Sequence, residues 1–190
     1  MKRWLAAVAL AAMAHAAFAQ EDLRKLTEES RKVANDLVTQ VRSELLRELE
    51  LSGPLKAVIV CKYTVPEITS AISRRTGWRV TRVSLKPRNP GLAGPDAWEQ
   101  KVLLDFERRV EQGEKPENLE HAEIVQEPAG RFFRYMKALP MAAPCTACHG
   151  PPEKMSEALR VQLANEYPHD QAIGTTVGQI RGATTVKRPL

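Results

Sequence analysis

The sequence Cys145-Thr146-Ala147-Cys148-His149 is the feature that most constrains this chain. Two thiols three positions apart lie on one side of a single backbone turn, where each can add to a vinyl group of a haem to form a thioether. The imidazole that follows at once is placed to ligate the iron. The sequence therefore predicts one covalent haem c, attached at Cys145 and Cys148, with His149 as the proximal iron ligand.

Two other chemistries use the same residue types. A zinc site would need a second ligand pair elsewhere, such as another CxxC or an HxxxH, and the sequence has neither. A dithiol redox site would open a helix in a βαβ unit, whereas this motif lies between Leu139-Pro140 and Gly150-Pro151-Pro152. Both alternatives are weaker than covalent haem.

Residues 1–19 have the form of a secretory signal peptide. A positive start at Met1-Lys2-Arg3 precedes an apolar run and an A-x-A cleavage site at Ala17-Phe18-Ala19. The apolar run is too short to span a bilayer, and no later segment approaches about 20 apolar residues. We therefore expect a mature domain of residues 20–190 that is periplasmic and does not span the membrane. In bacteria, c-type haem is attached in that same compartment.

Composition argues against a nucleic-acid partner and leaves one cysteine without a disulfide partner. The formal net charge is +5 and aromatic residues make up only 5% of the chain, without basic and aromatic residues interleaved, so nucleic acid is not an expected partner. The length suits one domain. The cysteine count of 3 is odd, so two thioethers leave Cys61 without a disulfide partner.

The remaining pattern predicts an α+β fold. Apolar residues at three- and four-residue steps predict a long amphipathic helix over 21–50. The other expected helices and strands are: a helix over 54–77 with a kink at Pro66, a strand over 78–85, a helix over 96–113 with a capping box, a hairpin over 121–126 and 131–138, a helix over 153–167, and a last strand within 173–186.

Several motifs together resemble a domain-of-unknown-function family of exported c-type haem proteins. The motifs are Cys61-Lys62-Tyr63-Thr64-Val65-Pro66-Glu67-Ile68, Arg88-Asn89-Pro90, Pro95-Asp96-Ala97-Trp98-Glu99, the CxxCH sequence with Gly150, and Gly174, Gly178 and Arg181-Gly182-Ala183. The resemblance covers nearly all of the mature chain. It implies a PAS-like antiparallel sheet with long N-terminal helices, found alone or as the extracytoplasmic part of sensor proteins.

The distal ligand of the iron is less constrained. The residues weighed for this position are Cys61, Met136, Met141, Met155, His121 and His169. Cys61 shares an apolar helical stripe with Ala57, Val58 and Val65, which would hold it against a haem face, although a buried free cysteine is also common as a small apolar residue. The resemblance makes Cys61 the distal ligand.

The function predicted from these features is electron transfer. A six-coordinate haem would exchange electrons with redox partner proteins, without enzymatic activity, since the sequence identifies no distal acid–base pair. The alternative is a haem-based redox or gas sensor module that signals through a partner. A homodimer through the N-terminal helix is a further expectation.

Overall fold

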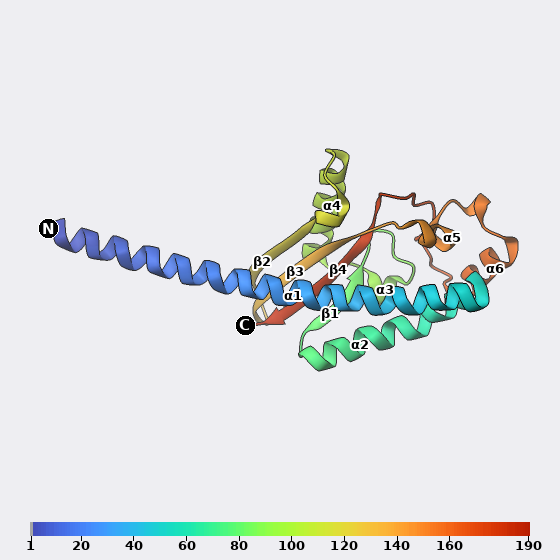
Figure 1. Cartoon of the computed structure of the whole chain (residues 1–190), viewed down its shortest axis with the longest axis horizontal. Coiled ribbons are helices and arrows are strands. Elements are labelled where there is room, and N and C mark those ends of the chain that lie inside the picture. Colours follow the sequence, from blue (N-terminus) through green and yellow to red (C-terminus); the bar gives the residue numbers. More distant parts are fainter. Residues whose placement is uncertain (1) are drawn as a thin grey trace.

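The computed structural model describes the backbone of residues 2–190 and the side chains of residues 20–190. The side chains of the expected signal peptide, residues 1–19, lie outside the described residues. A long helical hairpin covers one face of a small sheet, and a shorter helix covers the other face (Figure 1). The last strand completes the sheet. The α+β class expected from the sequence is confirmed.

The hairpin begins with α1 (Lys2–Ile59), which is broken at Gly53. Gly53 has a φ of 76°, a left-handed conformation that glycine adopts at little energetic cost, and the chain turns back there (Figure 1). The return passes through η1 (Val60–Thr64) and α2 (Val65–Thr76). The two expected helices are thus present, and the first begins before residue 21.

The kink expected at Pro66 takes the form of a π-helical turn just before it, at Val60–Thr64. A proline inside a helix offers no N–H, and its ring collides with the carbonyl four residues earlier, here that of Lys62. A π turn widens the helix at that level, and such turns are frequent at functional sites. Cys61 lies within this turn.

The sheet has four antiparallel strands in the order β1-β4-β3-β2. The strands are β1 (Arg79–Val83), β2 (Glu120–Glu127), β3 (Gly130–Pro140) and β4 (Ile180–Pro189). The expected hairpin of β2 and β3 is confirmed, with Glu127 opposite Gly130 at its tip. The last strand inserts between β1 and β3, so it joins segments that are distant in sequence.

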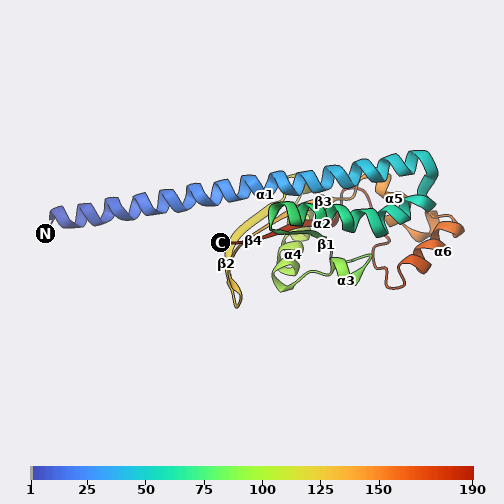
Figure 2. The same cartoon turned by 90° about the horizontal axis from the view of Figure 1, so that it is seen from below.

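Each face of the sheet has its own core. On one face, Leu37 of α1 and Ile72 of α2 pack with Tyr135 and Val186. On the other face, Leu103 and Phe106 of α4 (Ala97–Glu111) pack with Met136. Figure 2 shows this layering, with α1 and α2 on one side of the strands and α4 on the other.

Short elements connect the sheet to the motif. They are α3 (Pro90–Ala93), η2 (Pro116–Asn118), η3 (Ala143–Cys145), α5 (Thr146–His149), η4 (Pro152–Lys154) and α6 (Glu157–Glu166). The helix expected from residue 153 begins at Glu157, because the Ser156 side chain accepts a hydrogen bond from the Leu159 amide and caps it. Among the described residues, none of the helices has the length and apolarity needed to cross a bilayer.

A buried polar network fixes α4 on the sheet. The Glu99 side chain is fully buried, and its carboxylate accepts hydrogen bonds from Arg79 and Thr185, both at 2.9 Å, and closes the predicted capping box with the Asp96 amide. Arg134, whose side chain is 3% exposed, lies 3.2 Å from the same carboxylate. The guanidinium carbon of Arg134 lies 4.4 Å from the centre of the Trp98 ring. This network connects α4 to β1, β3 and β4.

We expect Glu99→Ala to lower the free energy of unfolding by about 3–5 kcal/mol, because it leaves the buried Arg134 without one of its charge partners. Urea unfolding followed by circular dichroism measures this change. Glu111→Ala, at an exposed position of the same helix, is the control and should change the free energy by less than about 0.5 kcal/mol. Equal effects of the two substitutions would contradict the role given to Glu99.

Candidate haem site

The three cysteines of the chain come together although Cys61 is far from the others in sequence. Cys145 ends η3 and Cys148 lies in α5, one turn further on. Cys61 lies in η1, and its thiol is close enough to Cys145 for the two charges to interact. Cys148 packs against a cluster that contains Val58 of α1 and Tyr167. The structure thus brings the two predicted attachment residues and the predicted distal ligand to one place.

His149 is held in the orientation and tautomer that a metal ligand needs. Its Nδ1 lies 2.8 Å from the carbonyl oxygen of Ala172 and 3.3 Å from Nε of Arg181. Arginine only donates, so Nδ1 cannot satisfy both, and the shorter contact assigns the proton to Nδ1, donating to the carbonyl. Nε2 is then the unprotonated nitrogen. Ligating histidines usually donate their other N–H to such a carbonyl.

Electrostatics keeps this imidazole neutral. Burial, followed by the charges of Arg181 and Arg88, lowers the pKa of His149 well below its ordinary value. The hydrogen bond to Ala172 opposes this shift but does not reverse it. A neutral imidazole is the form that binds a metal.

Arg88 fastens the motif to the segment that follows α6. Its Nε donates to Asp170 at 3.0 Å, another of its nitrogens donates to the Cys148 carbonyl, and its side chain is only 9% exposed. Asp170 in turn accepts from the amide of Ala172 at 2.7 Å. A continuous path of hydrogen bonds therefore runs from Cys148 through Arg88, Asp170 and Ala172 to His149.

Backbone pairing reinforces this arrangement. The Thr175 amide donates to the His149 carbonyl and the Gly174 amide to the Gly150 carbonyl, both at 2.9 Å. Gly150 closes the turn, and a Cβ at that position would lie 2.5 Å from the Thr146 carbonyl oxygen. Only glycine fits directly after the histidine.

The thiols of Cys61 and Cys148 are partly buried, and both burial and nearby guanidiniums shift their pKa. Burial raises the pKa of Cys61, while Arg82, Arg88 and Arg181 act in the opposite direction. Burial also raises the pKa of Cys148. Both cysteines keep part of their surface accessible, so they are enclosed without being sealed.

The other candidates for the distal position have structural roles. Met136 is fully buried on the sheet face covered by α4, and Met155 packs with Leu159 in the cluster beside Cys148. His121 lies 3.5 Å from Glu123 and 5.6 Å from the Trp98 ring, and His169 is exposed. Met141 is 2% exposed and its amide and carbonyl pair with residues 178–179. None of these side chains is shown to approach His149.

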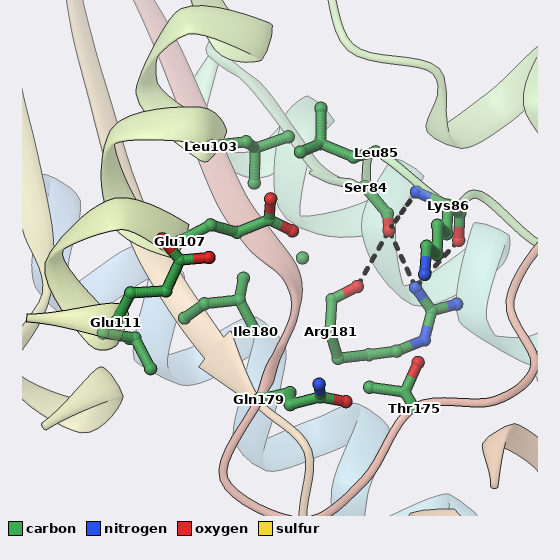
Figure 3. Close-up of a pocket in the computed structure, with 12 residues that line it drawn as sticks. Ser84, Leu85, Lys86, Leu103, Glu107, Glu111, Thr175, Gln179, Ile180 and Arg181 are labelled. Atoms are coloured by element: carbon green, nitrogen blue, oxygen red, sulfur yellow. Dashed lines mark hydrogen bonds between the residues drawn. The ribbon is translucent and has the colours of Figure 1, made fainter. Parts of the chain in front are cut away.

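A cavity of about 250 Å³ lies beside the motif, between α4 and the ends of β1 and β4 (Figure 3). Figure 3 shows Glu107 and Glu111 on one wall and Arg181 on the other, with Arg181 hydrogen-bonded to Ser84 and Lys86. Burial lowers the pKa of Arg181 to about 10. The lining includes no cysteine, and two of its residues, Arg181 and Thr175, contact His149.

The donor set suits a haem. Among residues 20–190, no group of three or more His, Cys, Asp or Glu side chains is arranged to hold a metal ion. A haem iron needs no such group because the porphyrin supplies its equatorial ligands. One imidazole nitrogen, two thiols in a single turn and a third thiol from another helix provide what covalent attachment and axial ligation require.

The contacts of two further residues with the site were not predicted from the sequence, although Arg181 belongs to one of the motifs that carry the family resemblance. Asp170 and Arg181 lie far from the motif along the chain, and no spacing pattern links either to His149. Arg88 is part of the Arg88-Asn89-Pro90 motif of the family resemblance, but the sequence does not predict its contacts with Cys148 and Asp170. The contacts that locate all three are long-range.

The fold and the site together define a class, an α+β domain in which a CxxCH turn is held at the end of an antiparallel sheet beside a helical hairpin. The chain belongs to the Tll0287-like family, whose model, described as Tll0287, matches residues 10–189. This membership agrees with the domain-of-unknown-function family of haem proteins that the sequence resembles.

A solved structure is similar over most of the chain. It is the crystal structure of the cyanobacterial heme-protein Tll0287, with a TM-score of 0.62 and 26% sequence identity. The similarity covers 89% of this chain and 95% of that one. Comparison with curated proteins gives no match.

We expect Arg88→Ala to lower the free energy of unfolding by about 3–5 kcal/mol, because it leaves the buried carboxylate of Asp170 without its charge partner. Urea titration measures the change. Arg160→Ala, at an exposed position of α6, removes the same charge and should have an effect below about 0.5 kcal/mol. If Arg88→Ala unfolds at the same urea concentration as the control, the proposed fastening of the motif is wrong.

Proposed function

We propose that this chain is a periplasmic monohaem c-type cytochrome that transfers electrons and catalyses no bond chemistry. The observation that carries the proposal is the fixed tautomer of His149, with Nδ1 bound to Ala172 and Nε2 unprotonated, one residue after the CxxC turn. Membership in the family and the similarity to a solved cyanobacterial heme-protein support it. When bound, the haem supplies an iron that alternates between ferric and ferrous states.

The residues take distinct roles in this proposal. Cys145 and Cys148 would form the thioethers, and Nε2 of His149 would ligate the iron. Cys61 would be the second iron ligand, because its thiol lies close enough to Cys145 for their charges to interact. A second protein ligand leaves no open position on the metal, which suits electron transfer rather than catalysis.

The surface near Cys61 supports exchange with a redox partner protein. Leu55, Ile59 and Tyr63 recur at four-residue steps and are 39%, 40% and 55% exposed. Val161 of α6 is 54% exposed. Leu55 and Val161 line one pocket, and exposed apolar side chains that lie together are typical of interaction surfaces. The partner's identity, the signal peptide and a homodimer through the N-terminal helix stay predictions.

The second candidate function is a redox or gas sensor that signals through a partner. The observation that favours it is the π-helical turn that carries Cys61. Such a turn rearranges more easily than a regular helix, so release of the thiol would change the geometry of η1. Lys62 of the same turn donates to Glu166 of α6 at 2.5 Å, which would carry the change to a second element.

Covalent attachment is tested by maturation in a bacterial host competent for cytochrome c assembly. We expect a coloured protein that keeps its pigment in acidified organic solvent, because thioethers survive this treatment and axial ligation does not. Replacing both Cys145 and Cys148 with Ser should release the pigment. A Cys61→Ser control should retain it, since that thiol forms no thioether. A wild-type protein that stays colourless would refute the proposed function.

Cys61→Ser tests the distal ligand, and carbon monoxide binding by the wild type distinguishes the carrier from the sensor. We expect a changed ferric absorption spectrum, because loss of a thiolate donor alters the ligand field. Met155→Leu is the matched control, since Met155 lies beside the site and is not expected to ligate; its spectrum should match the wild type. Carbon monoxide added to the ferrous wild type should leave the spectrum unchanged, whereas Cys61→Ser should bind it.

An unchanged ferric spectrum in Cys61→Ser would exclude this cysteine as a ligand. Ready binding of carbon monoxide by the ferrous wild type would instead favour the sensor. Both measurements use the same holoprotein samples.

A further inference from the structure

Arg82 differs from the basic residues near it in the sequence because, in the part of the chain that the structure describes, its side chain is neither paired nor fully exposed. Six basic side chains occur between residues 74 and 88: Arg74, Arg75, Arg79, Arg82, Lys86 and Arg88. Three of them form ion pairs, with Asp36, Glu99 and Asp170, and Arg74 and Lys86 are exposed. Within residues 20–190, no hydrogen bond or ion pair involves the side chain of Arg82.

Arg82 faces the candidate haem site. Side chains alternate along β1, so Arg82 shares the sheet face of Val80, which packs under α1 and α2, while Val83 faces α4. Burial lowers the pKa of Arg82, and the groups whose charges act on it are Cys61, Cys145 and Tyr167. Part of its surface stays accessible. The guanidinium of Arg82 is partly enclosed, remains accessible and has no paired counter-charge among residues 20–190, which suits an anionic ligand.

Two further polar groups near Arg82 lack partners. Tyr167 is 6% exposed, and its hydroxyl makes no hydrogen bond to any described side chain or backbone group. Burial raises the pKa of Tyr167, so the hydroxyl keeps its proton and can donate. Thr184, opposite Arg82 in the β1–β4 register, has a fully buried hydroxyl without a hydrogen-bond partner.

A guanidinium and a phenol together are suited to a carboxylate. The planar N–H groups of arginine match the two carboxylate oxygens, and a tyrosine O–H adds a third donor. The haem of the proposed function carries two propionate carboxylates. We propose that Arg82 and Tyr167 together bind one haem propionate. This inference rests on the proposed function and assigns a part of the site that the CxxCH motif does not specify.

The test uses the holoprotein with haem biosynthetically labelled at the propionate carboxyl carbons. Redox difference infrared spectra of the wild type, Arg82→Gln and Tyr167→Phe report the hydrogen bonding of the labelled carboxylates. We expect one labelled carboxylate band to shift in each variant, and the two shifts to be non-additive in the double variant. Tyr167→Phe keeps the ring that lies 5.8 Å from the Arg88 guanidinium carbon, so it removes only the hydroxyl.

The reduction potential is a second readout. Loss of the positive charge in Arg82→Gln should lower the midpoint potential, because a nearby cation favours the ferrous form. Arg74→Gln is the matched control: it removes the same charge from an exposed position and should leave both the infrared bands and the potential unchanged.

Each other outcome overturns the inference. Unshifted labelled bands in both variants, with covalent haem present by the solvent test, would refute the propionate contact and leave the proposed function intact. A second contrary outcome is that the labelled bands stay fixed, while added acetate alters the reduction potential of the wild type but not that of Arg82→Gln. This result would show that Arg82 and Tyr167 bind a free carboxylate instead of a propionate. A protein without covalent haem would refute both proposals, and the solvent test tells these cases apart.

Discussion

The buried ion pair of Arg88 and Asp170 is the interaction on which the arrangement of the site depends. Arg88 also donates to the Cys148 carbonyl, and Asp170 also accepts from the Ala172 amide. Ala172 then orients His149 through its carbonyl. Without this pair, the short α5 would depend on the backbone pairing of Gly174 and Thr175 alone, since four residues are too few for a stable helix. A single ion pair thus positions both the thiol and the imidazole.

The sheet provides the rigid frame for this pair. Gly182 shows how closely β4 lies beside β1, because a Cβ there would be 2.3 Å from the Val83 carbonyl oxygen. This closeness places Arg181 next to Ser84 and Lys86, and so next to His149. On the sheet face covered by α4, the Glu99 network fixes that helix. Packing of the two faces therefore sets the positions of groups that come from both ends of the chain.

What the sequence could predict follows from the range of the interactions. The capping box of Asp96 and Glu99 involves residues three apart, and the CxxCH turn is equally local, so both could be inferred directly. Helical and strand periodicities gave the fold class. Contacts of Arg88 with Asp170 join residues 82 apart, and no local pattern encodes them. The π turn at Cys61 was likewise expected only as a kink, because proline indicates a disturbance and not its geometry.

The charges around the site bear on the potential of the proposed haem. Within residues 20–190, Arg82 and Arg181 form no ion pair at contact distance, and positive charge near the iron would favour the ferrous form. A thiolate from Cys61 would have the opposite effect, because it would donate electron density to the iron and stabilise the ferric form. A direct ligand would act at bonding distance, whereas the guanidiniums would act from further away. The proposed ligand would therefore dominate, and the site would be suited to a low potential that the arginines raise only in part.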